Sequence, residues 1–177
     1  MKQILEPIDR FKREFVEITT PLPELIGKVP NELEKLATLL NDRSVYIQEA
    51  LKKLASATTS REYAEAIGDV RRSLDGVEKQ LRQIKDAMAE KLFMDMGILT
   101  GEGAADQSKA VISQLLDMVG RLEGLASGLG IRLETKEATP KPYIPNPDYY
   151  DARYMVLASM LTLGYLADRL GELLTST

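Results

Sequence analysis

The sequence predicts an all-α protein, folded as an up-and-down helical bundle of four long helices plus an N-terminal helix. Apolar residues recur three or four positions apart along nearly the whole chain, which is the spacing of a helix face. Prolines and glycines gather in short stretches between these periodic segments, where they end helices. The chain has 177 residues, 44% of them apolar, so we expect one domain with a substantial core.

Residues 1–30 form the first predicted unit, an N-terminal helix followed by a connection that contains prolines. We expect the helix over about residues 3–18, because its apolar residues share one face. These residues are Ile4, Ile8, Phe11, Phe15 and Ile18. Pro21 and Pro23 follow soon after, and proline lacks the N–H group that a continuing helix needs.

Residues 31–133 are expected to hold three long helices, the first of them from about Asn31 to Ala57. An apolar heptad indicates it: Leu33, Leu40, Ile47 and Leu54. Arg43 interrupts this stripe, and Asp168 extends an apolar row in the last helix. A charge on a core face must pair, reach solvent or mark a site. We therefore predict that Arg43 or Asp168 forms a buried or interfacial ion pair; the alternative places both at the rim of the bundle.

The next helix is the longest, and we predict it as one continuous element over about residues 61–96. Thr59 and Glu62 have the spacing of a capping box, which marks its start. Two heptad rows, as in coiled-coil packing, define its buried side. They are Ile67, Leu74, Leu81 and Met88 in one row, and Tyr63, Val70, Val77 and Ile84 in the other. The heptad fails beyond Met88, and Gly97 has the position of a C-terminal cap.

A glycine-rich connection, residues 97–103, leads to a helix that we expect from about Ala104 to Leu129. Its predicted core face carries six apolar residues, Val111, Leu115, Met118, Leu122, Leu125 and Leu129, and is widened by Ile112, Leu116 and Val119. Residues 134–147 form a proline-rich linker, or strap, before the last helix, because four prolines there exclude a helix.

The last predicted helix starts at Pro147, with Asn146 as its N-cap, and runs to about Leu174, so that it makes up the predicted apolar C-terminal unit of residues 148–177. It is apolar around most of its circumference, so it needs cover on several sides. We expect it to be either the central helix of the bundle or part of a subunit interface, since both places need the same apolar surface.

The composition excludes several kinds of chemistry. The chain has no Cys, so it holds no disulfide, thiolate metal site or thiol nucleophile. It has no His, which removes the commonest general base and the commonest metal ligand, and we expect no cofactor. Lys and Arg number 23 against 27 Asp and Glu, so the net charge of -4 argues against nucleic-acid binding.

The pattern of apolar residues also bears on location. The most apolar run, residues 154–167, is shorter than the roughly 20 residues that a membrane span needs. Acidic and basic residues appear near the N-terminus, where a signal peptide would have a long apolar stretch, so a cytoplasmic location is expected. Few Asn and Gln residues and mixed-sign charges along the helices are compatible with a thermophilic source.

Three carboxylates on the longest predicted helix form a candidate metal site. Glu62, Glu65 and Asp69 lie on one side of it, and carboxylate oxygens are the ligands that Mg²⁺ prefers. The same residues face away from the heptad rows, so the competing interpretation is a solvated helix surface.

Two other segments are candidates for protein contacts. The strap contains Tyr143 and is followed by Tyr149 and Tyr150, and both proline-rich segments and tyrosines occur often at interfaces. The competing interpretation is that these tyrosines pack on the protein's own surface. The end of the longest helix gathers an apolar tip: Met88, Leu92, Phe93 and Met96. An uncovered tip would need a partner, whereas a tip folded over the bundle end would not.

These observations predict a helical-bundle protein that acts by protein–protein association, as an oligomeric scaffold or a subunit of an assembly. Its expected partner is a second copy of the chain or another protein. The alternative is an enzyme that depends on Mg²⁺ or Mn²⁺ and acts on a phosphorylated small molecule through Glu62, Glu65 and Asp69. A third possibility is a bundle that encloses an apolar ligand between its helices.

Overall fold

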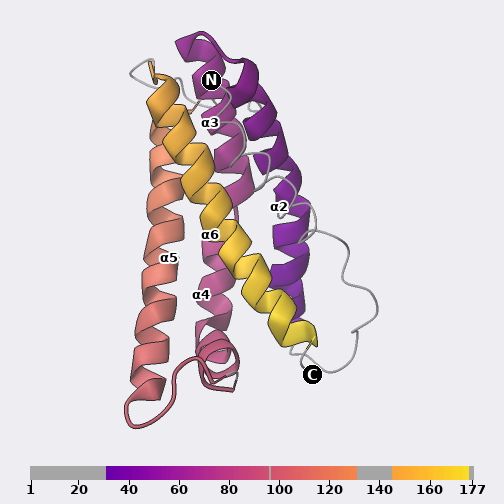
Figure 1. Cartoon of the computed structure of the whole chain (residues 1–177), viewed down its shortest axis with the longest axis vertical. Helices are drawn as coiled ribbons and strands as arrows, with labels where there is room; N and C mark the ends of the chain where they lie inside the picture. Colours follow the sequence, from indigo (N-terminus) through magenta and orange to yellow (C-terminus); the bar gives the residue numbers. More distant parts are fainter. Residues whose placement is uncertain (1–30, 96, 131–144, 176–177) are drawn as a thin grey trace, which may run out of the picture.

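The computed structural model describes residues 31–95, 97–130 and 145–175, and this part of the chain is all-α (Figure 1). No strand occurs among these residues. The elements are α2 (Asn31–Ser56), α3 (Ser60–Leu74), α4 (Val77–Met88), the π-helical turn η1 (Ala89–Asp95), α5 (Ala104–Leu129) and α6 (Tyr149–Thr175). The predicted N-terminal helix and most of the predicted strap lie outside the described residues.

Helices α2 and α5 begin and end within one residue of the predicted positions. Sharp local signals explain this agreement. The α5 helix follows Gly103, which has a left-handed φ of 83°, and it stops where the N–H of Gly130 donates to the carbonyl of Ala126 at 2.9 Å. Gly130 also lies against the backbone of α3, because a Cβ added to it would fall 2.9 Å from the Gly68 nitrogen.

The prediction of one continuous helix over residues 61–96 is wrong, because the chain breaks between α3 and α4. Asp75 takes an extended ψ of 122° and Gly76 a left-handed φ of 81°. Glycine reaches this region without the steric cost of a Cβ atom, so Gly76 allows the break. The break does not interrupt the core: Leu74 before it and Val77 after it are both fully buried. Figure 1 shows α4 continuing along the same side of the molecule as α3.

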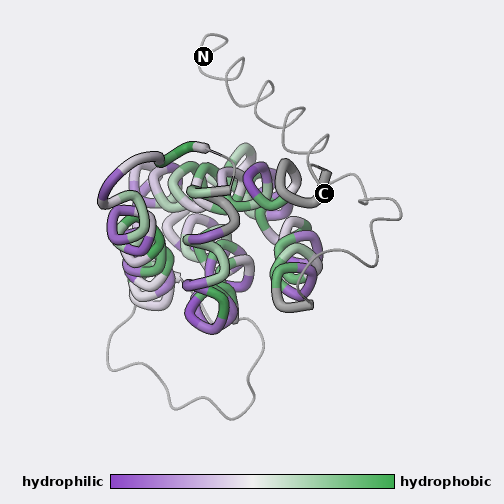
Figure 2. Tube along the Cα trace, turned by 90° about the horizontal axis from the view of Figure 1, so that it is seen from below, coloured by the Kyte–Doolittle hydropathy of each residue, from purple (hydrophilic) through white to green (hydrophobic). Residues whose placement is uncertain are grey.

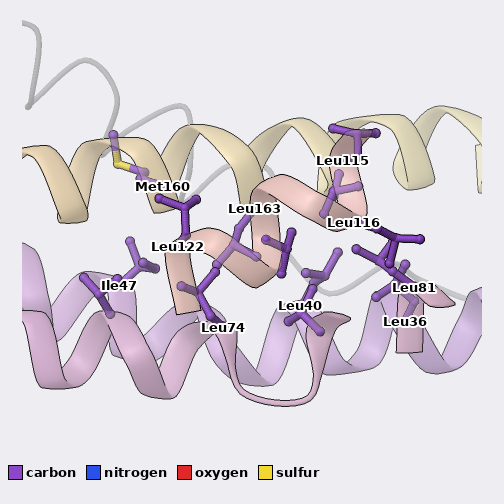
Figure 3. Packing of buried hydrophobic residues seen from close by; sticks show 14 of the residues in the cluster. Leu36, Leu40, Ile47, Leu74, Leu81, Leu115, Leu116, Leu122, Met160 and Leu163 are labelled. Carbon is purple, nitrogen blue, oxygen red and sulfur yellow. The ribbon is translucent and has the colours of Figure 1, made fainter. Parts of the chain in front are cut away.

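One hydrophobic core joins all these elements, and Figure 3 shows part of it. The α2 helix packs most extensively against α3, and α6 contacts α2, α3 and α5. The end-on view in Figure 2 shows hydrophobic and hydrophilic positions on the same helices, as an amphipathic arrangement requires. The core therefore sits between α6 on one side and the α2, α3, α4 and α5 helices around it.

The start of α6 differs from the prediction, which placed the N-cap at Asn146. The helix begins at Tyr149, and Asp148 caps it. One carboxylate oxygen of Asp148 accepts from the N–H groups of Tyr150 (2.8 Å) and Asp151 (3.0 Å). The carboxylate of Asp151 in turn accepts from the N–H of Asp148 at 3.0 Å. This reciprocal pair satisfies the free amides of the first turn, so the helix starts two residues later than expected.

The buried side of α5 covers only part of the predicted face. Met118 and Leu125 were expected in the core, yet both are exposed. The buried apolar residues include Leu115 and Leu122 of the predicted row, the three that were expected to widen it, and Ala126, which was not predicted. The α5 helix is apolar over a wide arc, so periodicity alone did not determine which part of the arc faces inward.

Candidate functional site

The most distinctive surface of the described residues is a row of apolar and aromatic side chains along α6. Tyr150, Tyr154, Leu161 and Tyr165 are 73%, 60%, 52% and 36% exposed. Their spacing of four, seven and four residues places them on one side of the helix, and we call this row the α6 outer face. Figure 1 shows α6 crossing in front of α3 and α4, with none of the described helices over its near side.

The opposite side of α6 is the part that holds the helix in the fold. Met155, Met160 and Leu166 are at most 2% exposed and belong to the core. Leu157 lies within the outer row but is half-buried, and it packs against the core. The helix is therefore apolar on two sides, and only one of them packs against the core.

Aromatic contacts hold the first turn of the α6 outer face in place. The Tyr149 ring stands edge-on to Tyr63 of α3, with ring centroids 6.2 Å apart. Tyr149 makes a second edge-on contact with Tyr150 at 5.7 Å. Tyr63 is itself held in position by a hydrogen bond, because its hydroxyl donates to the carbonyl of Ala57 at 3.2 Å. The exposed Tyr150 ring therefore rests on a fixed aromatic base, which reduces the entropy lost when a partner binds it.

At the other end of the row, a positively charged side chain lies over an aromatic ring. The guanidinium carbon of Arg169 lies 5.5 Å from the centroid of the Tyr165 ring. A cation at this distance is attracted by the face of the ring. The first turn has the exposed carboxylates Asp148 and Asp151, whereas the last part carries both signs of charge, because the exposed Asp168 adjoins Arg169.

The size of the α6 outer face sets the kind of contact it can make. A fully buried tyrosine covers about 200 Å², so the four exposed side chains together present roughly 400 Å². That is typical of the largest apolar patch on a monomeric protein, which is often functional. It is about half of what each partner contributes to a stable interface of standard size. Contact through this row alone would therefore be weak and dependent on concentration.

The predicted tip at the end of the longest helix folds inward where the structure describes it. Met88 and Phe93 are buried in the core, whereas Met94 is exposed. The π-helical turn explains this, because its hydrogen bonds join residues five apart and bring Phe93 into line with Met88. Met96 and the side chain of Leu92 lie outside the described part, as does Tyr143 of the strap. The signal in the sequence was the heptad that stops at Met88 while an apolar residue recurs five positions later.

The predicted metal-binding carboxylates each have another role. Glu62 completes a capping box: its carboxylate accepts from the N–H groups of Thr58 (2.7 Å) and Thr59 (2.9 Å). These backbone hydrogen bonds lower the pKa of Glu62 from its ordinary value of 4.5. Glu65 pairs with Arg61 across one helical turn, at 3.3 Å.

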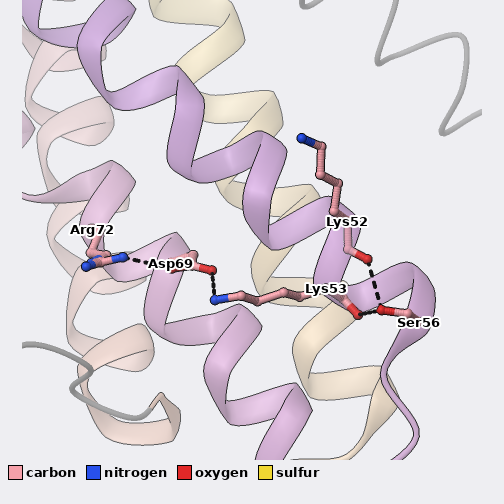
Figure 4. A network of polar contacts seen from close by, with 5 residues as sticks. All are labelled: Lys52, Lys53, Ser56, Asp69 and Arg72. Atoms are coloured by element: carbon pink, nitrogen blue, oxygen red, sulfur yellow. Dashed lines mark hydrogen bonds and ion pairs between the residues drawn. The ribbon is translucent and has the colours of Figure 1, made fainter.

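Asp69 is fully buried, which corrects the expectation that all three acids face solvent (Figure 4). Its side chain lies where α2 packs across α3, so Lys53 of α2 reaches it with Nζ 2.5 Å from Oδ2. Arg72 approaches the other oxygen, with Nη1 3.3 Å from Oδ1. Within the described ranges, no group of three acidic side chains is arranged to hold a metal ion. Asp69 is therefore placed to join two helices.

The two predicted ion-pair residues lie toward the edges of the molecule. Arg43 is partly exposed, and its Nη2 lies 3.5 Å from Oδ2 of the exposed Asp75. Its guanidinium also lies 5.9 Å from the Tyr46 ring centroid, and that of Arg72 lies 5.1 Å from the same ring. Asp168 is exposed near the end of α6. The Arg43 pair is thus at the rim of the interface between α2 and α3.

Glu123 of α5 is a half-buried acid that was not among the candidate residues predicted from the sequence. Burial raises its pKa above the ordinary value, and the neighbouring carboxylates Asp75 and Glu78 add to the shift, while Arg71 opposes it. Glu78 is itself paired with Arg82, with a carboxylate oxygen 2.5 Å from the guanidinium. No spacing in the sequence signals this group, because the residues come from three helices.

Comparison with known proteins gives no relative for this chain. No protein-family model matches it, and neither a curated protein nor a solved structure does. Among the described residues, none of the helices is both long enough and apolar enough to cross a membrane.

Proposed function

We propose that this protein acts by association with other copies of itself, as the building unit of an oligomer, and that the α6 outer face is the contact surface. The observation that carries the proposal is the row of Tyr150, Tyr154, Leu161 and Tyr165, which is exposed although α6 is otherwise a core helix. Tyrosines are enriched at protein interfaces, because a ring buries a large area while its hydroxyl stays solvated.

The kind of partner follows from the shape of the surface. Side chains in a row along a helix fit another helix, whose own row interdigitates with them. The chain lacks Cys and His, and the acids Glu62, Glu65 and Asp69 are engaged in capping and ion pairs. The helix contacts also support the finer fold prediction of an up-and-down bundle, to which the N-terminal helix and the strap would add.

The experiment is a measurement of molar mass by light scattering over a concentration series. The wild-type mass should rise from that of the 19.7 kDa monomer toward the dimer, with the gradual rise that a small interface produces. The variant Leu161→Asp should remain monomeric, because a charge in the middle of the row would be buried without a partner.

The matched control is Val45→Asp on α2, which adds the same charge at another exposed apolar residue. It should associate like the wild type. A wild-type chain that stays monomeric at every concentration would overturn the proposal. Equal association of wild type and Leu161→Asp would overturn it as well, because the contact would then lie elsewhere.

A further inference from the structure

The break between α3 and α4 lies beside a polar edge of α5 that the proposed association does not use. On the α3 side of the break, Nε of Arg71 donates to the hydroxyl of Ser127 at 3.0 Å. On the α4 side, the Glu78 carboxylate lies against Gly120, because a Cβ added to that glycine would fall 3.1 Å from Oε2. This edge of α5 therefore contacts both of the helices that meet at the break.

Glu123 occupies the middle of the same edge. It follows Gly120 by three residues and precedes Ser127 by four, so the three residues share one side of α5. Its side chain is half-buried, and a carboxylate in that position loses part of its hydration. A charge therefore sits between the contact to α3 and the contact to α4.

Glu123 faces one cation and two anions. Arg71 of α3 attracts its charged form, whereas Asp75 at the break and Glu78 of α4 repel it. Burial and these two anions raise the pKa of Glu123 above its ordinary value of 4.5. The charged form therefore costs free energy in the folded state, and the cost arises where α5 meets the break.

The two facing anions are each held by a cation of their own. Asp75 pairs with Arg43 of α2, whose Nη2 lies 3.5 Å from Oδ2. Glu78 pairs with Arg82 one turn further along α4. Neither carboxylate can turn away from α5 without weakening its ion pair, so the repulsion follows from the arrangement of the helices.

The break is also the place where the fold can bend. Gly76 has a left-handed φ of 81°, and among the described residues no side chain caps the first turn of α4. The α6 helix packs against α2, α3 and α5, whereas α4 is held mainly by α2, α5 and η1. Movement of α4 about Gly76 would therefore leave the contacts of α3 with α2 and α6 in place.

We propose that the break at Gly76 is a hinge, that the charge on Glu123 favours its opening, and that acid closes it. While Glu123 is ionised, its repulsion from Asp75 and Glu78 favours displacement of α4 from α5. Once Glu123 is protonated, the repulsion ends, and its hydroxyl can donate a hydrogen bond to a facing carboxylate. This device goes beyond the proposed association and does not depend on it.

Hydrogen exchange of single amides tests the hinge locally. Glu123→Gln keeps the shape of the side chain and removes its charge. At neutral pH, the amide of Gln80, which donates to the carbonyl of Gly76, should exchange several-fold more slowly in the variant than in the wild type, because the hinge opens less often. The amide of Ile67 in α3 should exchange equally in both proteins. The difference at Gln80 should vanish at about pH 4, where the wild-type Glu123 is also protonated.

The matched control is Asp117→Asn, which removes the same charge from an exposed position of α5. It should leave exchange at Gln80 unchanged. Equal slowing in the two variants would overturn the proposal, because any loss of negative charge from α5 would then suffice. Equal slowing at Gln80 and Ile67 would also overturn it, because Glu123→Gln would then stabilise the whole fold without closing a hinge.

Thermal unfolding checks the direction of the pH effect separately. Because the folded pKa of Glu123 is raised, its contribution to stability is fully present below about pH 4.5 and is lost as the pH rises through the folded pKa. Glu123→Gln should therefore melt about 2 °C above the wild type at neutral pH and together with it at about pH 4. A variant that melts at or below the wild-type temperature at neutral pH would overturn the proposal, because the charge would then not oppose folding.

Discussion

Helices α3 and α6 depart in opposite directions from the usual separation of apolar interior and polar surface. Asp69 of α3 is a charged residue with no exposed surface, and Tyr154 of α6 is an aromatic residue that is mostly exposed. Asp69 lies where α2 crosses α3 and meets two cations, Lys53 and Arg72. Tyr154 lies on the side of α6 that none of the described helices covers.

In both helices, the neighbouring elements decide which side chains are buried more than residue type does. A buried carboxylate is tolerated because two cations, one of which also donates a hydrogen bond to it, replace its hydration. An exposed aromatic row contributes little to folding, so its value lies in what it can bind. We therefore expect changes at Asp69 to act on stability and changes at the α6 outer face to act on association.

A substitution on the inner side of α6 is expected to lower the free energy of unfolding more than any other substitution considered below. Leu166→Ala should lower the free energy of unfolding by about 3 kcal/mol, because it leaves a cavity in a core position that has no exposed surface. The matched control is Leu161→Ala, the same substitution on the outer side, which should change stability by less than about 0.5 kcal/mol. Urea denaturation measures both, and equal losses would contradict the division of α6 into two sides.

The buried charge on α3 should have the next largest effect. Asp69→Ala removes two charge-assisted contacts and leaves Lys53 and Arg72 without their shared anion, at a cost of about 2 kcal/mol. The cost is moderate because both cations are partly exposed and can turn toward water. Glu65→Ala, which breaks the exposed Arg61 pair, is the control and should cost less than about 1 kcal/mol. If the two variants lose the same free energy of unfolding in urea, Asp69 does not stabilise the contact between α2 and α3 as its burial indicates.

The caps of the two helices should contribute equally, although the helices differ elsewhere. Thr59→Ala at the start of α3 and Asp148→Ala at the start of α6 each remove a side chain that accepts from the first-turn amides. Each should cost about 1 kcal/mol, the usual value for an N-cap. Thermal unfolding of the two variants provides the comparison. A much larger loss in Asp148→Ala would show that Asp148 does more than cap.

The exposed aromatic row should have almost no effect on stability and a clear effect on association. Tyr154→Ser should change the free energy of unfolding by less than about 0.5 kcal/mol. It should weaken association at least several-fold, because tyrosines at the centre of an interface supply much of its binding energy. Sedimentation equilibrium alongside urea denaturation separates the two quantities. A large loss of stability with unchanged association would reverse the roles assigned to the two sides of α6.

The smallest expected effect is a dependence on pH at the start of α3. The pKa of Glu62 is lowered in the folded protein, so its contribution is present above about pH 4.5 and is lost as the pH falls through the folded pKa. Glu62→Gln keeps an acceptor for the cap but cannot ionise. The melting temperature of wild type should therefore fall more between pH 5 and 3, roughly the window given by linkage, than that of Glu62→Gln. Parallel pH curves would show that Glu62 does not act through its charge.

Local signals made much of the fold predictable. The ends of α2 and α5 follow from heptads, glycines and prolines, each of which acts over a few residues. The capping box of Thr59 and Glu62 was also predicted from the sequence, because both residues lie on one helical turn. The break at Gly76 was not predicted, since a glycine within a heptad is compatible with both a weakened helix and a turn.

What the sequence could not predict depends on contacts between helices. The burial of Asp69 requires Lys53 from another helix, and no spacing within α3 indicates it. Which apolar side of α6 faces the core likewise depends on contacts with other helices. Tyr150 was recognised as a candidate contact residue, whereas Tyr154, Leu161 and Tyr165 were not, because a helix that is apolar on several sides does not reveal which side the fold leaves uncovered.

We propose the α6 outer face as a surface for self-association. The most direct measurement is the molar mass of the full chain and of Leu161→Asp in one concentration series by light scattering. We predict that the wild type approaches the mass of a dimer while Leu161→Asp stays at 19.7 kDa. Identical curves for the two proteins, whether monomeric or dimeric, would contradict the claim.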